Sequence, residues 1–460
     1  AMPFLSDVYH KRKTVAEIDQ IADDADLYYK NLVRLKLTNE NLGGDSYTDE
    51  LRFRGLKYVR TMNDLHNEKD AVRFRCIDGF KPEELYFIMV YGQDEIYTSS
   101  FLGTFKRMME RMDGLKGEEL FQKVHYDRFR TFIRMCAGYN TLNRFLEIID
   151  EDKKTQLLRD FIAGLEKGRE HDLEDAVDVA DAFGSIKDEK LAQFLKEEVT
   201  RNYERCAQER SIKGVIVYGL LATLFKGNTA ELDLPPINLV PYSSLVDDKG
   251  VVYQQYFFYG DEDGKMSYAG FLNNFRNGKW KITTEKYWTM IASTTGKPVV
   301  IYANLPLTEP EDEEAQGRLA KYFQEKGIKP TVVVHRGHSY HLPLTLEQLT
   351  RESRIVMLGS CGGYHNLGTV LDQSPDAHVI SSKQTGAMAI NDPIIMKMTD
   401  CMLAGDDVEW ISLWKNLDTY FQSRRGPVQE MFYDYVPPHK NLGVIFIKAY
   451  RKMVNRLDES

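Results

Sequence analysis

Two segments in the C-terminal half of the chain each join an apolar run to a turn that carries reactive side chains. In the first, residues 331–334 lead into His335-Arg-Gly-His-Ser-Tyr-His341, which offers three imidazoles. In the second, residues 354–358 lead into Gly-Ser-Cys-Gly-Gly, with a thiol at Cys361. Apolar runs of this length predict buried strands, so both sets of side chains lie at strand ends.

A cysteine in such a turn is suited to nucleophilic catalysis. The thiolate needs an imidazole partner to hold it ionised, and acyl transfer needs N–H donors for the developing oxyanion. A glycine-rich turn exposes backbone N–H groups and admits a substrate backbone. If the two strands are parallel neighbours, His338 and Cys361 project from the same edge of the sheet.

The elements around these turns alternate between strands and helices. Expected strands cover residues 299–303, 331–334, 354–358 and 377–381, and expected helices cover residues 309–327, 344–352, 392–403 and 408–421. Such alternation predicts a mainly parallel sheet with right-handed crossovers. Ligands on open α/β sheets bind beyond the carboxyl ends of the strands, which is where the two turns lie.

Proline divides the chain into two expected parts. Two of the 15 prolines lie in the first 230 residues, and helical apolar spacing recurs there, so residues 1–230 are expected to form an all-α domain. Residues 236–460 are expected to form the α/β domain. It begins with a small antiparallel β-meander at 251–292, with strands at 251–259, 266–271 and 279–284 joined by turns at 261–264 and 277–278.

The two strand-end turns resemble those of the caspase, gingipain, clostripain and separase group of cysteine peptidases. Gly337-His338-Ser339 is similar to the group's histidine turn, and Ser360-Cys361-Gly362 is similar to its cysteine turn. The order, histidine before cysteine, agrees, and the likeness covers roughly residues 295–420. Ser339 stands where the group usually has glycine, and the spacing of 23 residues is shorter than in caspases.

The resemblance implies a caspase-like α/β sandwich and a cysteine endopeptidase that acts on peptides or proteins. Carried over, Cys361 is the nucleophile and His338 protonates the leaving amine. The backbone N–H groups of Ser339 and Cys361 form the oxyanion hole, while the pocket is lined by Gly337, Gly362, Gly363 and His365. The group requires no acidic third member, and none is assigned.

Two other functions remain open. The same fold without activity would be a scaffold that binds peptides or partner proteins. The histidine cluster at 335–365, with Cys361, suggests a metal-dependent hydrolase, but a spacing of three on a strand puts side chains on opposite faces. We therefore expect no metal, and no cofactor is implied. His335 and His341 are expected to be packing or loop residues.

Composition excludes several classes of protein. The formal net charge of −9 argues against a nucleic-acid binder, and no apolar run approaches the length of a membrane span. Five scattered cysteines without a Cys-x-x-Cys pair predict neither a disulfide framework nor a zinc site. The first residues do not predict a signal peptide, and neither compartment nor oligomeric state is assigned.

Overall fold

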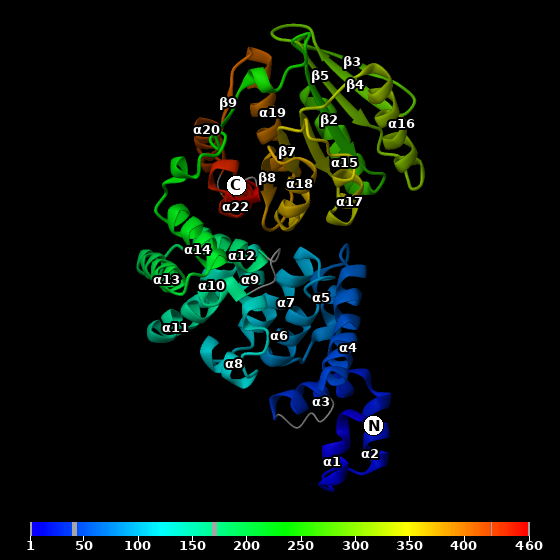
Figure 1. Ribbon diagram of the computed structural model, residues 1–460. Helices are drawn as coiled ribbons and strands as arrows, with labels where there is room; N and C mark the ends of the chain where they lie inside the picture. The colour runs from blue at the N-terminus through cyan, green and yellow to red at the C-terminus, as the bar shows by residue number, and fades with distance from the viewer. Residues whose placement is uncertain (1, 39–43, 168–172, 425, 459–460) are drawn as a thin grey trace. The chain divides into compact units, whose positions relative to one another are not determined.

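The computed structural model describes residues 2–38, 44–167, 173–424 and 426–458. The chain forms two compact units, one of residues 1–161 and 185–191 and the other of residues 162–184 and 192–460. In the described residues up to Phe225 helices are the regular elements, and an α/β region with an eight-stranded sheet follows, as the sequence predicts (Figure 1).

The first unit is built from helices, the longest of which has 21 residues. Its larger ones are α2 (Val15–Asp23), α3 (Ala25–Leu37), α4 (Gly44–Asp64), α6 (Pro82–Tyr91), α7 (Thr98–Glu110), α8 (Gly117–Lys123), α9 (Phe129–Gly138) and most of α11 (Glu151–Ile162). Local sequence sets several helix starts: the Thr14 side chain accepts a hydrogen bond from the Glu17 N–H, and the Glu17 carboxylate accepts one from the Thr14 N–H. Aromatic rings such as Tyr86, Phe121 and Phe132 fill its interior.

The second unit adds helices to the sheet that holds the candidate site. Its helices are α12 (Glu174–Ser185, except its last residue), α13 (Glu189–Gln208, from residue 192), α14 (Ile212–Phe225), α15 (Glu262–Asn274), α16 (Glu311–Lys326), α17 (Leu342–Leu346), α18 (Leu367–Gln373), α19 (Met388–Ala404), α20 (Trp410–Gln422), α21 (Pro427–Tyr433) and α22 (Leu442–Asp458). Three of them, α12 to α14, precede residue 230. The compact unit therefore begins earlier in the chain than the α/β region itself.

The large sheet has the strand order β10-β8-β7-β6-β2-β5-β4-β3. Its strands are β2 (Val252–Phe258), β3 (Trp280–Thr284), β4 (Trp288–Ser293), β5 (Val299–Asn304), β6 (Val332–Arg336), β7 (Ile355–Leu358), β8 (His378–Ser382) and β10 (Tyr435–Val436). The five strands from β8 to β5 in this order are parallel, and the pairs at both edges are antiparallel. A separate pair joins β1 (Leu239–Val240) and β9 (Val408–Glu409).

Helices cover both faces of the sheet because successive strand residues point to opposite sides. On one face, Val334 and Met357 join a core with α15, α19 and α20. On the other, Val333 and Val356 pack with α17, α18 and α22. The four strands expected at 299–303, 331–334, 354–358 and 377–381 are confirmed as β5 to β8.

One predicted strand is wrong. Residues 266–271 lie in helix α15, because the Asp261 carboxylate caps that helix by accepting a hydrogen bond from the Gly264 N–H at 2.7 Å. Tyr268, Phe271 and Phe275 then face the core at helical spacing. The antiparallel meander is present, but it consists of β3, β4 and β5, while β2 lies between parallel neighbours.

Candidate functional site

The turns that carry His338 and Cys361 leave the sheet at the same edge. Strands β6 and β7 are parallel neighbours, with His335 opposite Leu358 in the register. Each turn begins within three residues of that pair, at the carboxyl end of its strand. The structure thus confirms that the two strands are parallel neighbours, and both turns leave the sheet on the side of its carboxyl ends.

The backbone around Cys361 is held tightly. The N–H of Gly359 donates to the His335 carbonyl at 3.0 Å, which ties the start of the turn to β6. Gly362 has a positive φ of 60° and donates its N–H to the Gln384 carbonyl at 2.7 Å. Gly363 donates to the Ser360 carbonyl at 3.4 Å. Cys361 is partly exposed, and the backbone on both sides of it is held by hydrogen bonds.

The loop between β8 and α19 packs against the backbone of this turn. A Cβ atom on Gly386 would lie 2.3 Å from the Gly359 carbonyl oxygen and 2.5 Å from the Ser360 carbonyl carbon, so the two backbones touch there. Asn391 donates from Nδ2 to the Gly359 carbonyl at 2.9 Å and accepts from the Tyr435 hydroxyl at 2.8 Å. These buried hydrogen bonds hold the backbone of the Cys361 turn in place where it leaves the sheet.

Helix α12 also contacts the Cys361 loop. The Tyr364 hydroxyl donates to the Asp181 carboxylate, and both groups are buried beside Lys383. Burial raises the pKa of Asp181 and lowers the pKa of Lys383, and each charge partly offsets the shift of the other. A residue in the all-helical part of the sequence therefore anchors the segment that follows the thiol.

His338 lies beside two carboxylates of residues 261–264, which the sequence predicts to be a turn. Its Nε2 is 3.4 Å from the Asp263 carboxylate and 4.0 Å from that of Asp261. Its ring stacks on Tyr340 with a centroid distance of 5.2 Å. Both aspartates follow β2, which is the other parallel neighbour of β6. A carboxylate beside one imidazole nitrogen favours the ring orientation and tautomer that place an N–H on that nitrogen.

Asp261 is held as a carboxylate in this setting. Burial raises its pKa, but hydrogen bonds from His341 and from the Gly264 N–H, with the charge of the two imidazoles, outweigh burial and lower the pKa to about 2. His341 approaches it at 3.3 Å and stacks on Tyr259 with a centroid distance of 4.0 Å. Asp261 is therefore ionised at neutral pH, beside His338.

The remaining histidines do not join one cluster. His335 is fully buried and burial lowers its pKa to about 3. Its Nδ1 lies 2.7 Å from the Thr345 hydroxyl and its Nε2 lies 3.2 Å from the His338 carbonyl, which confirms it as a packing residue. His365 is exposed on the loop after Cys361. Within the described residues, no group of three or more His, Cys, Asp or Glu side chains could hold a metal ion.

Each glycine assigned to the pocket stands at a position where the local structure favours glycine. A Cβ atom on Gly337 would lie 2.3 Å from the Tyr259 ring, so this position admits no side chain. A Cβ atom on Gly363 would lie 2.7 Å from the Leu358 carbonyl oxygen. Gly362 and Gly363 are buried under the turn. These glycines shape the backbone that presents the thiol and the imidazole.

Comparison with protein-family models, with curated proteins and with solved structures finds no match for this chain. The fold defines an α/β protein in which an all-helical region is followed along the chain by a region with a mixed, mostly parallel sheet. No described helix is both long enough and apolar enough to cross a membrane.

Proposed function

We propose that this protein is a cysteine endopeptidase whose nucleophile is Cys361 and whose acid–base group is His338. The observation that carries the proposal is the parallel pairing of β6 with β7, which directs the two turns to one sheet edge. The partial exposure of Cys361 and the carboxylates beside His338 support it.

The chemistry assigns a task to each group. The Cys361 thiolate attacks the carbonyl carbon of a peptide bond, and a C–S bond forms. The protonated His338 gives its proton to the leaving amine as the C–N bond breaks. Water then attacks the thioester, His338 takes its proton, and the C–S bond breaks to release the acid. Asp263, which faces Nε2, orients the ring so that Nδ1 serves the thiol and the leaving group.

The backbone selects the oxyanion donors. The Gly362 and Gly363 N–H groups already donate to the Gln384 and Ser360 carbonyls, so they do not serve a substrate oxygen. The proposal assigns the N–H groups of Cys361 and Ser339, as the resemblance in the sequence implies. Ser339 supplies the same backbone donor as glycine would.

A peptide-library digestion analysed by mass spectrometry tests the proposal. The native protein and a Cys401→Ala control, which removes another partly exposed thiol, should cleave a common set of bonds. Cys361→Ala should leave those bonds intact, and His338→Asn should reduce cleavage by about 10²-fold or more. Cleavage that survives in Cys361→Ala would show that another group does the chemistry. If the native protein cleaves no peptide, the inactive scaffold becomes the better description.

A further inference from the structure

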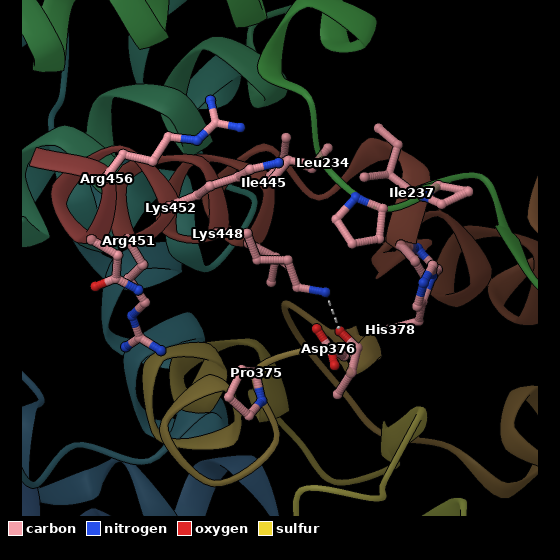
Figure 2. A pocket seen from close by; sticks show the side chains of 16 residues that line it. Leu234, Ile237, Pro375, Asp376, His378, Ile445, Lys448, Arg451, Lys452 and Arg456 are labelled. Atoms are coloured by element: carbon pink, nitrogen blue, oxygen red, sulfur yellow. Dashed lines mark hydrogen bonds between the residues drawn. The ribbon is translucent and has the colours of Figure 1, made fainter. Parts of the chain in front are cut away.

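A cavity of about 430 Å³ lies in the second unit, away from the candidate peptidase site (Figure 2). Its lining comes from helix α22, from residues 234–237 and from the turn that leads into β8. His378, in that lining, is the first residue of β8 and pairs with Ile355 at the amino end of β7. The Cys361 turn follows the carboxyl end of β7, about 10 Å further along the strand at ~3.3 Å per residue.

Lys448 extends from α22 into this cavity. Its Nζ donates a hydrogen bond to the Ala377 carbonyl at 2.8 Å, which is the dashed line in Figure 2. An ammonium has three N–H donors, so this bond leaves Lys448 able to donate to a further acceptor. Among the described residues Lys448 forms no ion pair within 4.0 Å. The nearby Asp376 carboxylate acts on Lys448 through its charge but forms its ion pair with Arg354, at 3.0 Å. A largely buried ammonium without an ion pair of its own is costly, and an anion in the cavity would supply that pair.

The rest of the lining combines positive charge with apolar walls. Arg451, Lys452 and Arg456 follow Lys448 at helical spacing on α22. They form ion pairs at the rim, Arg451 with Asp372 and the other two with Asp233. The walls are apolar and rich in proline, formed by Leu234, Pro235, Pro236, Ile237, Pro375, Pro438, Val444 and Ile445. The volume is that of a small-molecule site.

We propose that this cavity binds a small ligand that has an anionic head group, carboxylate or phosphate, and an apolar body. The head group pairs with Lys448, and the body lies against the proline and aliphatic walls. Four cations and one acid, Asp376, line the cavity. Arg451, Lys452 and Arg456 pair with the carboxylates of Asp372 and Asp233, so the head group is assigned to Lys448. The proposal is independent of the peptidase assignment, since the two sites lie at opposite ends of β7.

Calorimetric titration of the full chain tests the proposal with four probes: 4-phenylbutyrate, phenyl phosphate, the neutral 4-phenylbutanamide and inorganic phosphate. At least one of the two aryl anions should bind tenfold or more tightly than both the amide and inorganic phosphate. Which aryl anion binds identifies the head group. Equal binding of the amide, or no tighter binding by either aryl anion, would overturn the proposal.

Variants locate the binding. Lys448→Met keeps the length and apolar stem of the side chain and should weaken the aryl anion at least tenfold. Lys415→Met, at an exposed position on α20, should change nothing. A circular-dichroism melt checks that both variants fold. Wild-type affinity in a folded Lys448→Met variant would place the probe elsewhere and refute the assignment.

The pH dependence gives a second readout. Burial lowers the pKa of Lys448 to about 8, Arg354 acts in the same direction and Asp376 opposes it. His378, Arg451 and Lys452 are the other titratable groups of the lining near it. Affinity for the aryl anion should be steady from pH 6 to about 7.5 and fall as the pH rises above about 8, as the ammonium loses its proton. In Lys448→Met this fall should be absent.

Discussion

Selective alkylation of Cys361 at pH 6 is the sharpest consequence of the proposed dyad. The partly exposed Cys76 is an internal reference, because burial raises the pKa of its thiol to about 11. At pH 6 only ~10⁻⁵ of such a thiol is ionised, whereas a thiol paired with an imidazolium, with a pKa of about 6, is roughly half ionised. The thiolate advantage is therefore ~5 × 10⁴-fold.

Intrinsic nucleophilicity reduces that advantage. A Brønsted slope of about 0.4–0.5 over five pKa units costs ~10²-fold or somewhat more, so iodoacetamide should modify Cys361 ~10²-fold faster than Cys76. Cys401, also partly exposed and with a thiol pKa raised by burial, should be similarly slow. Peptide mass spectrometry of the native protein, quenched at successive times, gives the rate at each cysteine.

His338→Asn is the matched control. Without the imidazolium the pKa of Cys361 should return toward the ordinary value of about 8.5, and alkylation at pH 6 should slow by about tenfold after the gain in nucleophilicity is included. Cys361 reacting no faster than Cys76 in the native protein would refute the dyad. An unchanged rate in His338→Asn would show that another group activates the thiol.

Three further predictions follow from the structure around the site. Gly386→Ala places a Cβ against the backbone of the Cys361 turn and should lower the free energy of unfolding in urea by about 1–3 kcal/mol, with a marked loss of peptide cleavage. The control Gly317→Ala lies in open space on α16 and should leave the free energy of unfolding unchanged or raise it by up to about 1 kcal/mol. Asp261 has a folded-state pKa below its unfolded value, so its stabilisation is present above about pH 4 and is lost as the pH falls toward 2. Asp261→Asn, which keeps a capping side chain, should therefore lower the free energy of unfolding by about 1–2 kcal/mol at neutral pH and by less near pH 2; a constant difference across that range would contradict the argument. Asp263→Asn should lower kcat about tenfold with KM unchanged, and an equal rise in KM would assign Asp263 to substrate binding instead.

Much of the sheet could be predicted because its central strands are buried on both faces. Runs such as residues 331–334 and 355–358 must be almost entirely apolar, and the sequence shows this directly. The helical structure of residues 266–271 could not be predicted in this way, because Asp261-Glu-Asp-Gly has the composition of a turn. Its role as a helix start depends on the Asp261 cap and on the packing of Phe271 against β2, which are tertiary facts.

The cavity could not be predicted from the sequence for a related reason. Lys448 belongs to a basic, amphipathic helix, and Pro235 and Pro375 belong to ordinary loops. Each segment alone has a common surface composition. The site exists only because the fold brings residues 234–237, the turn before β8 and helix α22 around one largely buried ammonium.

The position of β2 explains both what was predicted of the candidate site and what was missed. A crossover between parallel strands places both carboxyl ends on the same side of the sheet, so the pairing of two neighbouring strands sufficed to predict that the His338 and Cys361 turns leave the sheet on that side. The carboxylate of Asp263 comes from a third strand end. It reaches the imidazole because β2 pairs with β6 in parallel, with Phe258 opposite Arg336. The sequence pattern predicts β2 as part of an antiparallel meander, in which it does not pair with β6. The position of Asp263 near His338 therefore could not be predicted from that pattern.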